Sequence, residues 1–201
     1  MKLGTVNTPN MEEDKYYHIF NRGNNRENIF KEQENYFYFL KQYEKYLSSV
    51  VDTYAYCLMP NHFHFLVRIK NQLPMTSKVS KTFEVMGRRL TPVEKAFKDF
   101  FISYAKSINK RYSRTGSLFQ YKFKRKPIDD EQYLKRVVLY IHQNPVAAGF
   151  CEQPYQWEFS SYNTILGDFT TMLKRDEVID FFDDKENFKY CHNLPVELEA
   201  D

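Results

Sequence analysis

Stretches rich in β-forming residues alternate along this chain with stretches in which apolar residues recur at helical spacing. Residues 16–20, 52–58 and 62–70 have the first pattern and predict three β-strands. The sequence Met-Pro-Asn at 59–61 is a turn signal, so the second and third strands should form an antiparallel hairpin. Within residues 117–128, apolar residues are interspersed with lysines, and part of this segment is predicted to be a fourth strand.

Helical spacing predicts two helices between these strands, over residues 31–48 and 93–111, where aromatic and aliphatic residues recur every three or four positions. A third helix should begin after a run of acids and span residues 131–143, stopping at the Asn-Pro sequence that follows because proline cannot continue the hydrogen-bond ladder. A short helix is expected at residues 176–182. Residues 71–92 have weak periodicity and read as a long connection that can hold a short helix.

The order of these elements is β-α-β-β-α-β followed by a helix, which is the order of ferredoxin-like folds. We therefore expect an α+β protein in which two helices cover one face of an antiparallel sheet and leave the other face available. An additional C-terminal helix carries Tyr140. The expected organisation is a disordered leader (1–14), one folded domain (15–165) and an acidic extension (166–201) that solubilises the protein or covers a basic surface.

Composition indicates one soluble domain. The chain has 201 residues, of which 42% are hydrophobic and 27% charged. It has no apolar window of about 18 residues and no signal-peptide pattern at its polar start, so no membrane partner is expected. Three widely spaced cysteines argue against a disulfide framework and a cysteine-based zinc site. We expect a cytoplasmic protein.

The net charge of +3 is distributed unevenly along the chain. Residues 106–126 hold eight lysines and arginines and no acid, whereas residues 176–201 hold nine acids and two lysines. A basic middle segment suggests a polyanionic partner, although a solvated surface explains the same pattern equally well.

Two histidines stand in the third predicted strand. Successive side chains of a strand point to opposite faces, so His62 and His64 should share one face about 7 Å apart while Phe63 and Phe65 point into the core. Two neighbouring imidazoles on a rigid strand can hold one divalent metal ion. The alternative is that both are polar residues on the solvated face of a sheet.

The late helix carries a second set of candidate residues. Tyr140 and Asn144 are four positions apart and therefore face the same side of this helix. The alternative for Tyr140, one of sixteen tyrosines, is packing or a surface position.

Five motifs, in order, resemble the REP-associated tyrosine transposases, relatives of the single-tyrosine insertion-sequence transposases in the HUH nuclease superfamily. The resemblance covers roughly residues 15–165. The motifs are Asn-Arg-Gly at 21–23, Leu-Met-Pro-Asn-His-Phe-His-Phe-Leu-Val at 58–67, Gly-Ser-Leu-Phe-Gln at 116–120, Tyr-Ile-His-Gln-Asn-Pro-Val-Ala-Ala-Gly at 140–149 and Trp-Glu-Phe-Ser-Ser-Tyr at 157–162.

This resemblance implies a role for each matching residue. His62 and His64 match the metal-binding histidines, Tyr140 matches the nucleophile, and Asn144 matches the polar residue that completes the metal shell, with Gln143 as the competing choice. The family cleaves single-stranded DNA at imperfect palindromes that form hairpins. It leaves a 5′-phosphotyrosine link and a free 3′-hydroxyl that can rejoin strands. The implied cofactor is Mg²⁺ or Mn²⁺, which stabilises charge on the phosphate.

Basic residues are the candidates for DNA contact, because they pair with phosphates while exposed aromatic residues stack on unpaired bases. The candidates are Lys122, Lys124, Arg125 and Lys126 around the fourth strand, Arg22 after the first strand, and, as secondary choices, Arg88, Arg89, Lys110, Arg111 and Arg114. Among the interleaved aromatic residues, Tyr121 and Phe123 are either stacking platforms or the buried face of a strand.

Several questions stay open at the level of sequence. A tyrosine phenol has a pKa of about 10, so a base or metal must help to remove its proton, and neighbouring His142 lies about 100° around the helix from Tyr140. The protein can act as a monomer or as a homodimer. The other functional readings are a domesticated, non-catalytic nucleic-acid-binding module of the same fold and a phosphodiesterase that uses water.

Overall fold

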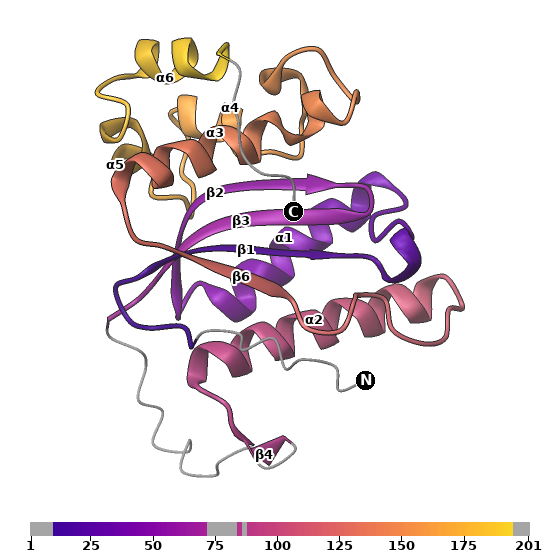
Figure 1. Cartoon of the computed structure of the whole chain (residues 1–201). Coiled ribbons are helices and arrows are strands. Elements are labelled where there is room, and N and C mark those ends of the chain that lie inside the picture. Colours follow the sequence, from indigo (N-terminus) through magenta and orange to yellow (C-terminus); the bar gives the residue numbers. More distant parts are fainter. Residues whose placement is uncertain (1–9, 72–83, 86–87, 195–201) are drawn as a thin grey trace, which may run out of the picture.

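The computed structural model describes residues 10–71, 84–85 and 88–194 and contains one central four-stranded sheet (Figure 1). Its strands lie in the order β2-β3-β1-β6, and every neighbouring pair is antiparallel. This order and the helices between the strands confirm the predicted α+β fold. The strands are β1 (Tyr16–Arg22), β2 (Val51–Met59), β3 (His62–Ile69) and β6 (Lys124–Ile128).

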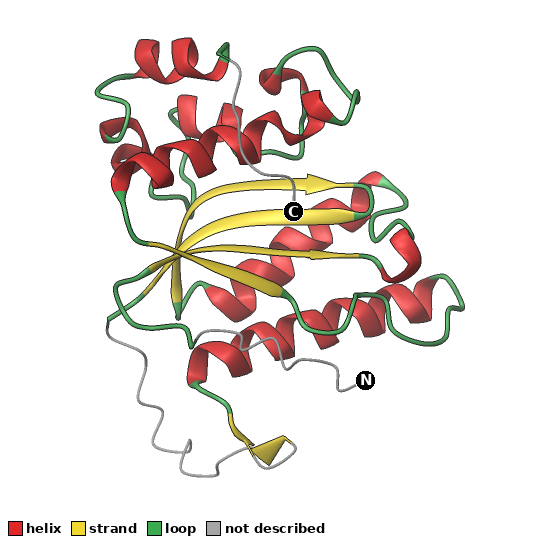
Figure 2. Ribbon diagram, viewed as in Figure 1, coloured by secondary structure: helices red, strands yellow, loops and turns green. Residues whose placement is uncertain are grey.

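Two long helices cover one face of the sheet, α1 (Gln33–Leu47) and α2 (Pro92–Arg111) (Figure 2). Aromatic side chains fill the space between these helices and the sheet. The rings of Tyr43 and Phe65 stack with centroids 4.2 Å apart, and Phe39 lies 4.8 Å from Phe100. Burial of these large rings is the main stabilising contribution to this layer.

Strand register determines which side chains point away from this core, to the other face of the sheet. In the pairing of β1 with β3, Phe20 lies opposite His64 and Ile19 lies opposite Phe65. The buried Ile19 and Phe65 point toward α1 and α2, so Phe20 and His64 point to the other face. A slip of one residue would exchange the two sets and place the histidines in the aromatic core.

The helix α3 (Glu131–Ala147) packs on this second face, mainly over β2 (Figure 1). The prediction that it stops at Asn144 was wrong, because the helix continues through Pro145. Proline removes only one hydrogen bond in the last turn, and the helix ends instead at Ala147, just before Gly149, whose φ of +73° suits a residue without a Cβ. The amide of Gly149 bonds to Val146 O at 3.0 Å and that of Phe150 to Pro145 O at 2.9 Å.

The C-terminal segment is folded: it holds the short helix predicted at residues 176–182 and further helices that were not predicted. It contains α4 (Tyr162–Leu166), α5 (Arg175–Asp180) and α6 (Lys185–His192), which gather beyond α3 in Figure 1. Val178 and Phe188 are fully buried. The sequence indicated less structure in this region because its few buried apolar residues are outnumbered by surface acids.

The residues before α4 cover the outer edge of β2. The amide of Leu58 bonds to Phe159 O, and that of Ser161 bonds to Tyr56 O, both at 2.9 Å. The indole of Trp157 donates to Leu58 O at 3.0 Å. This pairing satisfies the backbone groups of an edge strand that would otherwise be open to another chain.

The remaining elements are short. They are two 3₁₀ turns, η1 (Asn24–Arg26) and η2 (Pro154–Gln156), and a small hairpin formed by β4 (Glu84–Val85) and β5 (Arg88–Arg89). This hairpin lies in the connection that was predicted to hold a short helix, and residues 72–83 and 86–87 lie outside the described part. None of the helices in the described ranges has the length and apolar character needed to span a membrane.

The folded part begins earlier than predicted. Met11 is buried, and the amide of Asp14 bonds to Ile69 O at 2.9 Å, so residues 10–14 belong to the domain and not to a disordered leader. Residues 1–9 lie outside the described part.

Candidate functional site

Side chains from β1, β3 and α3 meet on the second face of the sheet. The ring of His64 lies 5.2 Å from that of His62 and 5.5 Å from that of Tyr140, measured between centroids. A third histidine, His18 on β1, lies 5.8 Å from the ring of Tyr140. One chain therefore brings the predicted tyrosine into contact with His64 of the predicted histidine pair.

The helix α3 sets the positions of Tyr140 and Asn144. Their four-residue separation places them on one side, and the Asn144 amide donates to Tyr140 O at 2.9 Å. Asn144 also forms a side-chain hydrogen bond with His62. The other candidate amide, Gln143, points away and donates to His192 O at 2.9 Å and Leu194 O at 2.8 Å. Of the two, only Asn144 is turned toward the histidines.

His62 is held neutral at physiological pH. Burial lowers its pKa to about 4, and the positive charge of Arg22 adds to this effect, while the hydrogen bond with Asn144 opposes it. Its Nδ1 lies 2.6 Å from Asn61 Oδ1, an oxygen that can only accept, so Nδ1 carries the proton. The lone pair of the neutral ring is then on Nε2, the nitrogen left for the contact with Asn144 or for a ligand.

His64 is also neutral and is more deeply buried, with 3% of its surface exposed. Burial lowers its pKa well below the ordinary value, and the neighbouring His18, His62 and Arg22 lower it further. Its Nδ1 lies 2.9 Å from Nε2 of His18. A neutral imidazole is the form that binds a metal ion.

These residues fit a divalent metal ion that is also bound by a substrate or by water. Among the described residues, no group of three or more histidine, cysteine or acidic side chains is arranged to hold a metal. Two imidazoles and the amide of Asn144 supply three nitrogen and oxygen donors, which leaves further coordination positions for phosphate oxygens. Mg²⁺ and Mn²⁺ commonly bind in this shared manner.

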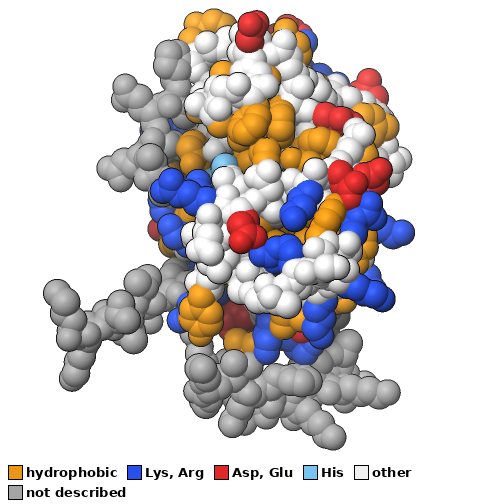
Figure 3. All heavy atoms as spheres, turned by 90° about the vertical axis from the view of Figure 1, so that its right-hand side faces the viewer, with side chains coloured by type: hydrophobic (Ala, Val, Ile, Leu, Met, Phe, Trp, Pro, Cys, Tyr) orange, Lys and Arg blue, Asp and Glu red, His pale blue; other side chains and the backbone are white. Residues whose placement is uncertain are grey.

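Several predicted DNA-contacting residues lie on the same face as the histidines. The ammonium groups of Lys124 and Lys126 stand 5.3 and 5.9 Å from the ring centroid of Phe20, and both side chains are exposed. Arg22, opposite His62 in the sheet, is partly buried. Figure 3 shows a histidine at the surface with lysine and arginine side chains nearby.

Tyr121 and Lys122 form an exposed pair in the loop before β6. Tyr121 is 83% exposed, and the Lys122 ammonium lies 5.8 Å from its ring centroid. Phe123, in contrast, is only partly exposed and packs against Phe97 at 5.2 Å. Of the two interleaved aromatic residues, only Tyr121 is available for stacking on a base.

Arg125 must be removed from the DNA-contacting candidates. Its side chain points to the opposite face of the sheet, is 8% exposed, and forms an ion pair of 3.0 Å with Glu94 of α2. Two secondary candidates, Arg111 and Arg114, form ion pairs with acids that precede α1. Lys110, another secondary candidate, is exposed on α2, outside the histidine face. For Arg88 and Arg89 the structure describes only the backbone of β5.

His142 is excluded as the base for Tyr140. It is fully buried, with Nδ1 2.8 Å from His192 Nε2 and Nε2 2.7 Å from Ser161 Oγ. Its ring therefore faces α6 and α4, on the side of α3 away from the tyrosine.

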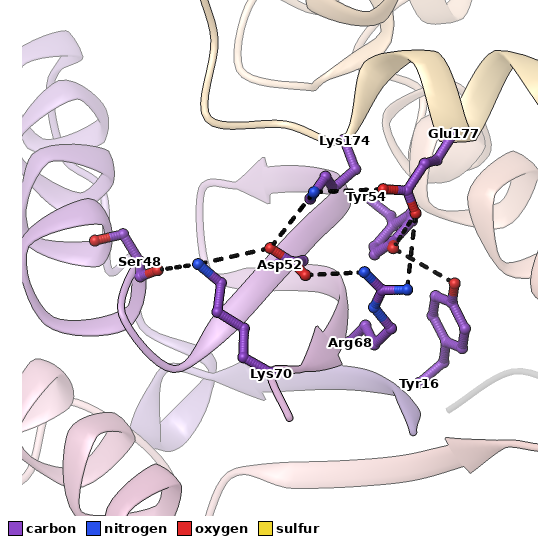
Figure 4. Close-up of polar contacts among 8 residues, drawn as sticks. All are labelled: Tyr16, Ser48, Asp52, Tyr54, Arg68, Lys70, Lys174 and Glu177. Carbon is purple, nitrogen blue, oxygen red and sulfur yellow. Dashed lines mark hydrogen bonds and ion pairs between the residues drawn. The ribbon is translucent and has the colours of Figure 1, made fainter. Parts of the chain in front are cut away.

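A second polar cluster lies at the other end of β3 and fixes α5 to the sheet (Figure 4). A bulge in β2 turns Tyr54 toward Glu177, to which its hydroxyl donates at 2.5 Å. Arg68 bonds to Asp52 at 3.1 Å, and Lys174 lies 3.4 Å from Glu177. Both acids of the cluster are paired with bases, so the cluster is structural.

Sequence reasoning missed His18. It lies on β1 and comes beside His64 only because β1 pairs with β3, a contact between segments more than 40 residues apart. A histidine two residues before Phe20 in a strand pattern was the available signal, but it does not reveal which strand lies next to it.

Comparison with known proteins agrees with this arrangement. The family model described as "Transposase IS200 like" matches residues 12–144, more than half of the chain, and this range ends at Asn144. A solved structure, "Structure of the REP associates tyrosine transposase bound to a REP hairpin", has a TM-score of 0.58 and 14% identity, covering 83% of this chain and 94% of that chain. At that identity the likeness shows the fold. No curated protein matches the chain. Since the family match spans the sheet, both histidines and the tyrosine helix, the chain belongs to the IS200-like transposase family.

Proposed function

We propose that this protein cleaves and rejoins single-stranded, hairpin-forming DNA through a covalent 5′-phosphotyrosine intermediate on Tyr140. The observation that carries the proposal is the 5.5 Å contact between the rings of Tyr140 and His64 within one chain. The phenol thus lies beside the two neutral imidazoles to which a phosphate-bound metal ion would be attached.

Each bond change in this reaction has a defined place. The Tyr140 oxygen attacks phosphorus and forms a new phosphoester, while the bond from phosphorus to the 3′-oxygen breaks. The phenolic proton leaves, and the departing 3′-oxygen takes up a proton to become a hydroxyl. The DNA on the 3′ side of the cut stays on Tyr140 through its 5′-phosphate, and because one phosphodiester has replaced another, a 3′-hydroxyl can reverse the reaction.

His62, His64 and Asn144 would hold Mg²⁺ or Mn²⁺ in this site. When bound, the ion supplies a positive charge that stabilises the phosphate oxygens and orients the phosphate for in-line attack. The protein contributes neutral imidazoles, whose lone pairs need no deprotonation near pH 7 because burial lowers the pKa of both histidines. Gln143 is not included, since its amide is bonded to the end of α6.

Lysines around β6 would hold the DNA backbone. Lys124 and Lys126 stand beside the histidine face, and Lys122 and Tyr121 extend from the preceding loop. Phosphate pairing by lysine gives affinity without sequence specificity, and a ring such as Tyr121 can stack on any unpaired base. The REP-associated transposase of similar fold is bound to a REP hairpin, which supports a hairpin substrate. Because one chain supplies every site residue, the proposed chemistry does not require a dimer.

The test is a covalent-adduct assay. Single-stranded DNA that forms a hairpin and is labelled at its 3′ end is incubated with the protein and Mg²⁺ or Mn²⁺. The products are then resolved on a denaturing gel. Wild type should form a labelled protein adduct and Tyr140→Phe should form none, while Tyr133→Phe, two turns earlier on α3, serves as the matched control. An adduct on Tyr140→Phe would refute the assignment. Cleavage with a free 5′-phosphate would indicate a water-using phosphodiesterase, and binding without cleavage would indicate a non-catalytic module.

A further inference from the structure

A third histidine lies beneath the candidate site and has no part in the chemistry proposed above. His18 is 3% exposed, and its ring centroid lies 5.1 Å from that of His64, with the two ring planes inclined by 23°. Its Nε2 is 2.9 Å from His64 Nδ1, and its ring meets that of Tyr140 edge-on at 5.8 Å. His18 thus contacts both the metal-ligand candidate and the nucleophile candidate.

The sheet holds His18 firmly in this place. It stands on β1, which is hydrogen-bonded to β3 on one side and to β6 on the other, opposite Leu66 and Lys126. Phe20, two residues along the same face, lies 4.8 Å from the His18 ring and 5.7 Å from the His64 ring. A ring packed in this way is preorganised, which a site-supporting residue requires.

The hydrogen bond between the two histidines has two arrangements, and only one of them suits a metal site. When both rings are neutral, one proton lies at this contact, carried either by His64 Nδ1 or by His18 Nε2. If it is on His64 Nδ1, the other nitrogen of that ring is bare and can bind a ligand. If it is on His18 Nε2, His64 carries its own proton on Nε2, and the ligand position is blocked.

The neighbouring His62 shows the same design with a different partner. Its Nδ1 donates to Asn61 Oδ1 at 2.6 Å, which leaves Nε2 without a proton and as the ring nitrogen available for the bond with Asn144. Metal-binding histidines generally donate their second N–H to an oxygen or nitrogen acceptor, which fixes the ring and its tautomer. Both members of the pair therefore have a partner at Nδ1, and for His64 that partner is His18.

We propose that His18 is a positioning residue that accepts the Nδ1 proton of His64 and so keeps His64 Nε2 bare and directed at the phosphate site. The purpose of this tautomer rests on the proposed function, since it matters only if His64 binds a metal ion. Loss of such an outer partner typically lowers metal affinity about 10–100-fold.

The first test needs neither metal nor DNA. Long-range ¹H–¹⁵N correlation spectra of the histidine rings in the metal-free protein report which nitrogen carries the proton. Wild type should show His64 protonated on Nδ1, and His18→Met should shift His64 toward the Nε2–H tautomer. A wild-type His64 ring protonated on Nε2 would overturn the proposal without affecting the role of Tyr140.

The second test separates hydrogen bonding from packing. His18→Gln keeps an oxygen close to the position of Nε2, whereas His18→Met keeps volume but accepts poorly. Titration calorimetry with Mn²⁺ should show about 10–100-fold weaker binding for His18→Met and near wild-type binding for His18→Gln, with metal-free hairpin binding unchanged in both. Equal loss in the two variants, or no loss in a folded His18→Met, would overturn the proposal. The Tyr140→Phe adduct assay tests the proposed function separately.

Discussion

Acid should destabilise this protein through a buried chain of histidines between α3 and α6. Nδ1 of His192 lies 2.7 Å from Phe188 O, which can only accept, so this nitrogen carries the proton. His192 Nε2 then accepts from His142 Nδ1 at 2.8 Å, and His142 Nε2 lies 2.7 Å from Ser161 Oγ, a hydroxyl that also lies 3.2 Å from Tyr56 O. Every nitrogen of the two rings has a hydrogen-bond partner, and burial disfavours a positive charge on either ring. Both rings are therefore confined to the neutral form.

The size of the effect follows from the pKa shift. Burial lowers the pKa of His192 from 6.5 to about 4 and that of His142 well below 6.5. Below pH 6.5 the unfolded chain binds protons that the folded chain excludes, so stability falls as pH falls and is flat above about pH 7. At 1.36 kcal/mol per pH unit, the shifted pKa of His192 alone lowers the free energy of unfolding by about 3 kcal/mol between pH 6.5 and pH 4. That is a large part of the roughly 5–15 kcal/mol stability of a domain.

The assay is urea unfolding followed by circular dichroism between about pH 7.5 and pH 5. His192→Gln removes one titrating group but keeps an oxygen that can accept from His142 Nδ1. Its stability should fall less steeply with acid than that of wild type, by about 1.4 kcal/mol per pH unit below pH 6.5. Tyr190→Gln, on the exposed side of the same helix, should keep the wild-type slope. Identical slopes for wild type and His192→Gln would refute the assignment of His192 as a histidine held neutral.

Three further predictions concern the site and its surroundings. Asn144→Ala should weaken Mn²⁺ binding and slow adduct formation about 10–100-fold, whereas Gln143→Ala should leave Mn²⁺ affinity unchanged. Equal losses of affinity for the two variants in calorimetry would reject Asn144 as the amide ligand. Lys124→Ala should weaken hairpin binding and reduce the slope of log affinity against log salt by about one unit, while Lys41→Ala on α1 should alter neither. Arg125→Met should lower the free energy of unfolding by about 3 kcal/mol or more by breaking a buried ion pair, and an unchanged urea midpoint would contradict that role.

Local patterns in the sequence were sufficient to predict the elements that carry the site. Alternation in β3 placed His62 and His64 on one face, and helical spacing placed Tyr140 and Asn144 on one side of α3. The hairpin between β2 and β3 follows from a turn of two residues, which needs no long-range information. These features are fixed by neighbours a few residues apart, so a single sequence contains them.

Features that depend on distant contacts could not be predicted in this way. Arg125 stands in a basic run and resembles its neighbours in sequence, but its position in β6 turns it toward Glu94 in the core layer. His18 became a candidate only when β1 was found beside β3. The choice between Asn144 and Gln143 depended on α6, whose last turn accepts the Gln143 amide. In each case the deciding partner is remote along the chain.

Contacts on both sides of α3 determine its rotation, which connects the C-terminal helices to the candidate site. Tyr140 and Asn144 turn toward the histidine face, whereas His142, between them in sequence, turns toward α6 and α4. A rotation of α3 by one residue, about 100°, would break the hydrogen bonds of His142 and carry the phenol away from His64. In sequence the acidic segment resembles a separate extension. In the structure its helices cover the buried side of α3, and the opposite side of α3 carries Tyr140. The proposed phosphotyrosine chemistry therefore depends on packing contributed by residues that lie beyond the family match at 12–144.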